Sequence, residues 1–185
     1  MNGLDERFTF GTSISMGVLT SIYRVPVSIK EELIKNPELI ESLFYPDYRE
    51  QGDVTPEEVG LPLDWQPSKY GFDKEWEDYL ELYSQVGRYE LMSALESKVT
   101  QVEHDCGGYV RYWSPEQLQQ IVKMMSEFTK KDFLRECLAV DDLTDYDGKP
   151  YEDFMLESMV GIHSSFQKFI RSATETGDMM FAVSQ

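Results

Sequence analysis

The sequence is poor in the features that mark secreted and membrane proteins. It has only two cysteines, Cys106 and Cys137, among 185 residues, too few for a disulfide framework and typical of free thiols in a reducing compartment. No apolar run approaches the roughly 18 residues that a membrane-spanning helix needs. The first segment, MNGLDERFTFGTSIS, lacks the basic start and apolar core of a signal peptide. We therefore expect a cytoplasmic protein.

The sequence also lacks the motifs that identify common catalytic and cofactor sites. It contains no glycine-rich phosphate loop and no Cys or His spacing typical of a metal site. Paired carboxylates occur, but with 34 acidic residues in the chain chance pairs are expected and do not indicate a glycosidase. We therefore expect no enzyme, no cofactor and no bound metal.

Basic residues are scarce, with 17 Lys and Arg against 34 Asp and Glu and a formal net charge of −17. The acidic excess is spread along the chain, since residues 1–70 hold 12 acids and 6 bases, residues 71–113 hold 9 and 4, and residues 114–185 hold 13 and 7. Nucleic acid and anionic membranes are disfavoured as direct ligands, because phosphate contacts require Lys and Arg. The charge favours a basic protein as partner, although solubility alone would produce the same composition.

Residue patterns predict a single domain that contains strands and several helices. The β-branched and aromatic residues of GVLTSIYRVPV predict a strand, and MMFAVS near the C-terminus predicts a short buried one. Helical periodicity and cap residues predict two short helices within residues 28–44, the first capped by Ser28, and further helices over 73–86, over 89–97, from Ser114 onward, and from Pro150 to Gly177.

Residues 45–71 contain four of the eight prolines and are predicted to form a long ordered loop, with one helical turn after Thr55. Aromatic residues of this span, including Tyr48, Trp65 and Tyr70, alternate with acids. Rigid aromatic side chains surrounded by charge anchor protein interfaces. A loop folded onto its own core would have the same composition, so both interpretations stay open.

Four segments in order carry a family resemblance. They are MGVLTSIYRVPVSIKEELIKNPELIESLFYP at residues 16–46, FDKEW, GGYVRYWSPEQL and FQKFIRSATETGDMMFAV. Together they resemble the YfbM-like proteins, the family called domain of unknown function 1877. The resemblance covers residues 16–185 and implies an α+β domain in which several helices pack on a small mixed β-sheet, without an established activity or catalytic residues. It also makes residues 1–15 an N-terminal extension or an alternative start.

The segment DDLTDYDGKPYEDFMLE, residues 141–157, has seven carboxylates and one lysine. Aligning Gly148 with the invariant glycine of a calcium loop places Leu143 and Phe154 where oxygen ligands are required, so the match fails. A looser Mg²⁺ or Ca²⁺ site and a plain solvated turn remain open. We predict an exposed loop that meets a basic partner. The candidate partner-binding residues are Tyr48, Trp65, Tyr70, Asp141, Asp142, Asp145, Asp147, Glu152 and Asp153.

Two histidines invite a catalytic interpretation. His104 and Cys106 would share one face of a strand, where the imidazole could activate the thiolate, but no third orienting group is identified. His163 flanks the apolar stripe of the last helix and is expected to be a hydrogen-bonded core-edge residue rather than a metal ligand.

The function predicted from these patterns is a non-enzymatic acidic binding protein, an immunity protein that neutralises a basic bacterial toxin by occluding its active site. One alternative is a small enzyme or small-molecule-binding protein with a pocket near His104, Cys106 and Arg111. Another is a DNA-mimic inhibitor, which requires carboxylates spaced like phosphates along one face.

Overall fold

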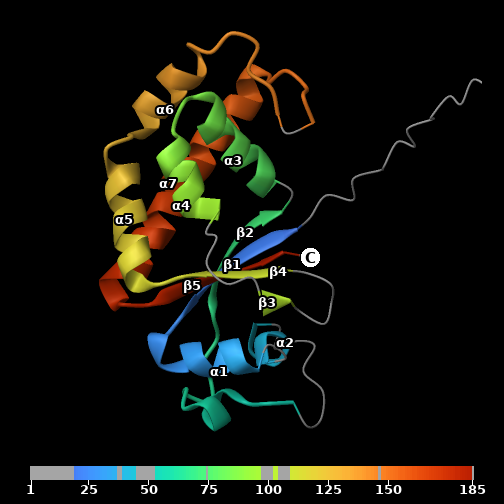
Figure 1. Cartoon of the computed structure of the whole chain (residues 1–185), viewed down its shortest axis with the longest axis vertical. Helices are drawn as coiled ribbons and strands as arrows, with labels where there is room; N and C mark the ends of the chain where they lie inside the picture. Colours follow the sequence, from blue (N-terminus) through green and yellow to red (C-terminus); the bar gives the residue numbers. More distant parts are fainter. Residues whose placement is uncertain are drawn as a thin grey trace, which may run out of the picture.

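A five-stranded β-sheet separates two layers of helices (Figure 1). The computed structural model describes residues 19–36, 39–44, 53–73, 75–96, 102–103, 109–145 and 147–184. The strands are β1 (Thr20–Val25), β2 (Ser68–Asp73), β3 (Val102–Glu103), β4 (Tyr109–Trp113) and β5 (Met179–Ser184). The α-helices are α1 (Lys30–Lys35), α2 (Leu39–Phe44), α3 (Glu75–Gln85), α4 (Tyr89–Glu96), α5 (Pro115–Ser126), α6 (Lys130–Cys137) and α7 (Asp153–Thr176), and the short 3-10 helices are η1 (Val27–Ile29) and η3 (Pro56–Val59).

The predicted α+β fold class is confirmed, with one difference in the sheet. The strand order is β2-β1-β5-β4-β3, and each described pair is antiparallel. The expected mixed sheet is therefore wrong for the described strands. The predicted extension, residues 1–15, lies outside the described residues. None of the described helices is long and apolar enough to cross a bilayer.

Strand β5 lies at the centre of the sheet and is buried on both faces. Met180 and Ala182 contact the larger core beneath α3 to α7, whereas Phe181 and Val183 contact the smaller core beneath α1 and α2. A strand covered on both faces has no solvent-facing positions, which explains why residues 179–183 of β5 are all apolar instead of alternating. The prediction of a buried C-terminal strand is confirmed.

Helix α7 is the longest helix and carries the stripe that fills the larger core. Leu156, Met159, Phe166, Ile170 and Ala173 are buried along it at helical spacing. The helix ends as predicted at Gly177, whose φ of 72° is a left-handed conformation that glycine adopts readily.

The start of α7 differs from the prediction. The helix begins at Asp153 with Glu152 as its N-cap, whereas Pro150 forms an isolated β-bridge with Thr144. Because Pro150 takes part in this pairing across the preceding loop, the helix begins about one turn later than predicted.

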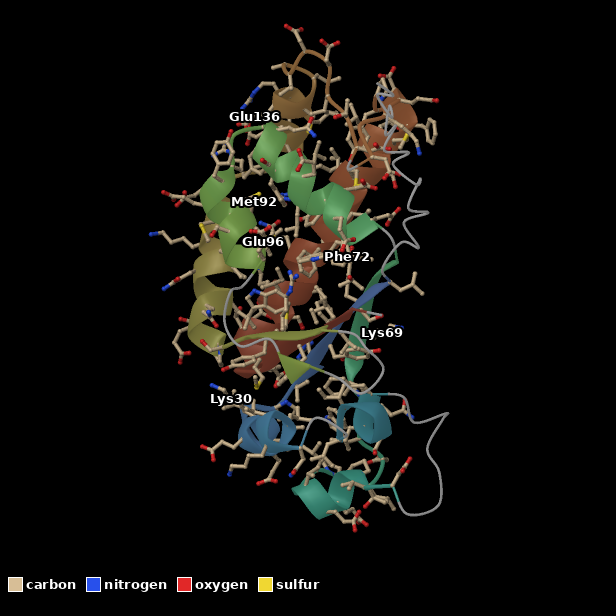
Figure 2. All side chains as sticks on the ribbon, turned by 45° about the vertical axis from the view of Figure 1, so that its right-hand side comes forward. Lys30, Lys69, Phe72, Met92, Glu96 and Glu136 are labelled. Atoms are coloured by element: carbon tan, nitrogen blue, oxygen red, sulfur yellow. The ribbon has the colours of Figure 1, made fainter. Side chains whose placement is uncertain are left out.

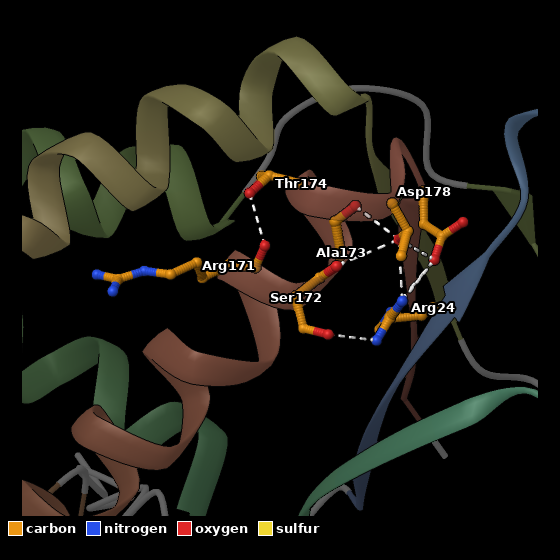
Figure 3. A network of polar contacts seen from close by, with 7 residues as sticks. Arg24, Arg171, Ser172, Ala173, Thr174 and Asp178 are labelled. Carbon is orange, nitrogen blue, oxygen red and sulfur yellow. Dashed lines mark hydrogen bonds and ion pairs between the residues drawn. The ribbon is translucent and has the colours of Figure 1, made fainter.

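A polar network fastens the end of α7 to β1 (Figure 3). Arg24 donates to Asp178 Oδ2 at 2.8 Å through Nη2 and to Ser172 Oγ at 2.7 Å through Nη1. The Arg24–Asp178 pair is mostly buried, with side chains 17% and 19% exposed. Since both charges are paired and hydrogen-bonded, the network fixes the turn between α7 and β5.

The predicted helix starts are confirmed at two positions and wrong at a third. Ser114 caps α5, its hydroxyl accepting from the Gln117 amide, and Thr55 caps η3, so both predicted starts are confirmed. The predicted Ser28 cap is wrong, because η1 precedes α1 and the N-cap position falls on Ile29 without a side-chain bond. Helix α6 was not predicted, and β2 takes up the end of the predicted 45–71 loop.

Candidate functional site

The acidic loop lies at the end of the molecule opposite η3, at the top of Figure 1. We call residues 138–145 and 147–154 the acidic tip. Its exposed carboxylates are those of Asp141, Asp142, Asp147, Glu152 and Asp153, whereas Asp145 is half-buried. The predicted exposure of the loop is confirmed for these five side chains, and their binding role stays a prediction.

The backbone of the acidic tip is held by contacts with α3 and by a bond across the loop itself. Gln85 Nε2 donates to the Thr144 carbonyl at 2.7 Å, and the Thr144 amide donates to Gln85 Oε1 at 3.0 Å. Leu143 is 8% exposed in the larger core, and its carbonyl accepts from the Tyr151 amide at 3.1 Å. These contacts tie one side of the loop to α3 and close it onto its other side.

Asp145 organises the turn rather than facing solvent. Its Oδ1 accepts from the Lys149 amide at 2.8 Å, and its carbonyl accepts from the Gly148 amide at 2.9 Å. Lys149 Nζ lies 3.4 Å from Asp147 Oδ2, and both of these side chains are exposed. Such an exposed pair contributes little stability. Most of the loop's negative charge is therefore not neutralised by Lys149.

Two large apolar side chains flank the acidic loop in the sequence and are exposed. Leu138 directly follows α6 and is 64% exposed, and Phe154 lies in the first turn of α7 and is 66% exposed. Burying either side chain against a partner would stabilise a complex by about 1.5–3 kcal/mol. Apolar side chains next to charged ones are the composition of a protein interface.

A hollow of about 330 Å³ lies beside the turn between α3 and α4. Arg88 lines it with its guanidinium 4.4 Å from the Phe128 ring centre and donates to both Glu136 carboxylate oxygens, at 3.0 and 2.7 Å. The bonds to Glu136 raise the pKa of Arg88. With Arg88 paired, Glu90 and Glu127 leave the hollow with net negative charge.

Helix α6 connects this hollow to the acidic tip. Glu136, which binds Arg88, is followed two positions later by Leu138 at the start of the tip. Figure 2 shows Glu136 toward the end that carries the tip, and Lys30 toward the opposite end. Because α6 itself carries three bases and two acids, the acidic surface of the tip does not continue along this helix.

The aromatic candidates do not form one patch. Tyr48 lies outside the described residues. Trp65 is half-buried against the smaller core, whereas Tyr70 packs against the larger core. The Tyr70 hydroxyl hydrogen-bonds with Ser165 Oγ at 2.6 Å, and burial raises its pKa. These contacts hold β2 on α7, and any partner-binding role of either side chain remains a prediction.

The alternative pocket cannot be assembled from the described residues. His104 and Cys106 lie outside them. Arg111 on β4 donates to the Glu96 carbonyl at 3.2 Å, and its Nε is buried without a hydrogen-bond partner in the described part of the chain. Cys137 is a free thiol, as predicted. It is also buried, and burial raises its pKa to about 12. It is therefore protonated and unreactive near neutral pH.

His163 is hydrogen-bonded, as predicted, but it lies inside the core rather than at its edge. It is fully buried, with Nδ1 2.6 Å from the Tyr83 hydroxyl and Nε2 2.9 Å from the Phe128 carbonyl. Burial lowers its pKa. Among the residues that the structure describes, no group of three or more His, Cys, Asp or Glu side chains could hold a metal ion.

Comparisons with known proteins agree with the resemblance noted in the sequence. The fold is similar to that of a solved protein of unknown function, YfbM from Escherichia coli, with a TM-score of 0.54 and 11% sequence identity, covering 90% of this chain and 99% of that one. No curated protein matches. A family model described as a domain of unknown function, DUF1877, matches residues 16–183. Because this match covers most of the chain, the protein belongs to the DUF1877 family.

Proposed function

We propose that this protein is a non-enzymatic binding protein of the cytoplasm that uses the acidic tip to capture a basic protein. The observation that supports this proposal is the way the tip is built. Five exposed carboxylates stand on a loop that is tied to α3 through Gln85 and Thr144. A loop that is already ordered loses little conformational entropy when it binds, so more of the contact energy becomes affinity.

Charge and apolar surface have separate roles in this proposal. The carboxylates of the tip attract a cationic partner over a distance of about 8 Å at physiological salt and raise the association rate. Leu138 and Phe154 slow dissociation because their exposed apolar surface is buried against the partner when the complex forms. The hollow beside Arg88 adds a second contact, since Glu90 and Glu127 can pair with a Lys or Arg side chain of the partner.

The partner class that we propose is a bacterial toxin, with this protein as its immunity protein. A toxin that handles nucleic acid, nucleotide or NAD needs a cationic cleft to bind its phosphates. Such a cleft is the electrostatic complement of the tip. Insertion of the tip into the cleft occludes the active site without any chemistry by the inhibitor.

The test compares two triple variants with equal changes in charge. The tip variant combines Asp141→Asn, Asp142→Asn and Asp147→Asn, all at exposed positions. Asp142 has a φ of 57°, a conformation that asparagine tolerates well, so the variant should fold normally. The control variant carries Glu32→Gln, Glu57→Gln and Asp64→Asn, which are exposed in the half of the molecule that holds α1 and η3.

Tagged wild-type protein, the tip variant and the control variant are used in parallel to capture partners from the parent organism, and the association rates of the captured partner are then measured. We expect a basic protein whose association rate falls about tenfold or more only with the tip variant. The partner's own nuclease or NAD-cleaving activity should fall when the wild-type protein is added in equimolar amount. Equal rates for all three proteins would place the interface elsewhere, and a partner without such activity would refute the toxin assignment.

A further inference from the structure

A second hollow, of about 490 Å³, has the opposite sign to the rest of the molecule. It lies between the junction of α5 with α6 and the C-terminal half of α7. Among the described residues, the charged ones that line it are Lys130, Lys168 and Arg171, and none is acidic. Because the chain has twice as many acids as bases, a group of three charged residues would ordinarily include at least one acid. The hollow is therefore a local reversal of the surface charge.

The three cations are not neutralised by their surroundings. Within the described ranges, none of them forms an ion pair with a carboxylate, whereas Arg135 on the same helix as Lys130 binds Asp132 at 2.7 Å. Arg171 makes one long contact, from Nη2 to Ser126 Oγ at 3.5 Å. In Figure 3 its side chain extends away from the network around Arg24. Unpaired cations that repel one another are stabilised by a shared anion.

The remaining lining residues are polar. They are Ser126, Thr129, Ser164 and Gln167. The Ser126 and Thr129 hydroxyls already donate, to the Val122 carbonyl and to Asp132 Oδ2, so Ser164 and Gln167 supply the neutral donors. A guanidinium can donate two parallel bonds to one phosphate. None of the lining residues that the structure describes is apolar or aromatic. It therefore offers no surface on which a nucleotide base could stack.

The nearest negative group on α6 is already engaged. Asp132 accepts from the Thr129 hydroxyl and pairs with Arg135, and these bonds lower the pKa of its carboxyl group. Thr129 is the N-cap of α6, so the positive end of the helix dipole points toward the hollow. Distant acids weaken the site less than their number suggests, because salt screens charges beyond about 8 Å at physiological ionic strength.

We propose that this hollow binds a phosphorylated polyol, such as a sugar phosphate. The cations recognise the phosphate, and Ser164 and Gln167 hydrogen-bond with the sugar. The volume lies within the range of about 300–1,000 Å³ usual for small-molecule sites and exceeds what a free phosphate ion fills. This site is independent of the acidic tip and of the function proposed for it.

The experiment is isothermal titration calorimetry of the full chain in about 0.15 M salt, with glucose 6-phosphate, inorganic phosphate and glucose as ligands. The site variant is Lys168→Ala with Arg171→Ala. The control variant is Lys123→Ala with Lys131→Ala, which removes two exposed cations from α5 and α6 that do not line the hollow. All four side chains are exposed, so both variants should fold.

We expect glucose 6-phosphate to bind the wild type and the control variant within about twofold of each other, and glucose not to bind. The site variant should lose at least about tenfold in affinity, since each charge-assisted hydrogen bond contributes that much or more. Equal losses in the two variants would mean nonspecific attraction and overturn the proposal. Inorganic phosphate binding as tightly as glucose 6-phosphate would retain an anion site and overturn the assignment of a sugar phosphate. No binding of either anion would overturn both.

Discussion

Replacing Tyr83 by phenylalanine should destabilise the fold much more than the same change at Tyr79, although both side chains are fully buried. The two hydroxyls lie 2.5 Å apart, and the Tyr83 hydroxyl also lies 2.6 Å from His163 Nδ1. His163 Nε2 lies 2.9 Å from the Phe128 carbonyl oxygen. A carbonyl oxygen can only accept, so Nε2 carries the proton and Nδ1 accepts from Tyr83. The Tyr83 oxygen then accepts from Tyr79.

This order of donors sets the size of each effect. Tyr83→Phe leaves two buried polar groups without partners, the Tyr79 hydroxyl and His163 Nδ1. Each such group costs about 1–3 kcal/mol, so we expect a loss near 3 kcal/mol in the free energy of unfolding. Tyr79→Phe removes one donor from a Tyr83 oxygen that still donates to His163. Its cost should be about 1 kcal/mol.

Urea unfolding of the two single variants and the double variant measures these losses. The double variant should lose less than the sum of the single losses, because Tyr79→Phe removes the hydroxyl that Tyr83→Phe would strand. Tyr89→Phe is the control, since Tyr89 is 61% exposed and the change should stay within about 0.5 kcal/mol. Equal losses for Tyr79→Phe and Tyr83→Phe would refute the assigned order of donors.

Two further predictions concern the core histidine and the loop contact. Burial lowers the folded pKa of His163 below its unfolded value of about 6.5, so the unfolded state binds more protons as the pH falls. As the pH falls from 6.5 toward the folded pKa, the free energy of unfolding of the wild type should decrease by about 1.4 kcal/mol per pH unit relative to that of His163→Gln. Urea unfolding at several pH values measures this difference, and parallel pH profiles for the two proteins would contradict it. Gln85→Ala keeps every carboxylate but removes the partner of the Thr144 amide and carbonyl, so the loop becomes less ordered. The affinity for the basic partner should therefore fall, while the salt dependence of the association rate stays unchanged. Unchanged affinity would mean that loop order does not matter, and Gln66→Ala, an exposed glutamine, is the control.

Elements with strong local signals were predictable from the sequence. The helix that begins at Ser114 has a capping box with Gln117 and a first-turn proline, and these residues act within one turn. The left-handed Gly177 ends α7 for an equally local reason. The capping box of Thr129 and Asp132 could also have identified α6. That helix was missed because its buried stripe consists of only Phe133 and Cys137.

Elements that depend on distant partners were not predictable. Strand β2 reads SKYGFD, with polar residues and a glycine that suggest a turn, and it forms because its backbone pairs with β1. The same limit applies to the candidate sites. The Gln85–Thr144 contact joins residues 59 positions apart, and the cationic hollow joins residues 126–130 to residues 164–171. In each case, the individual residues carry no signal that distinguishes them from other surface residues.

The net charge of −17 is therefore a poor guide to what this protein binds at any one place. At physiological salt, screening strongly weakens the effect of charges more than about 8 Å away. The acidic tip and the cationic hollow therefore act on ligands almost independently. A cation near the tip meets five exposed carboxylates and one lysine that is already paired with Asp147. An anion at the hollow meets Lys130, Lys168 and Arg171, and no carboxylate stands among the described lining residues. Raising the salt concentration should weaken binding at both surfaces, and substitutions at one surface should leave the salt dependence at the other unchanged.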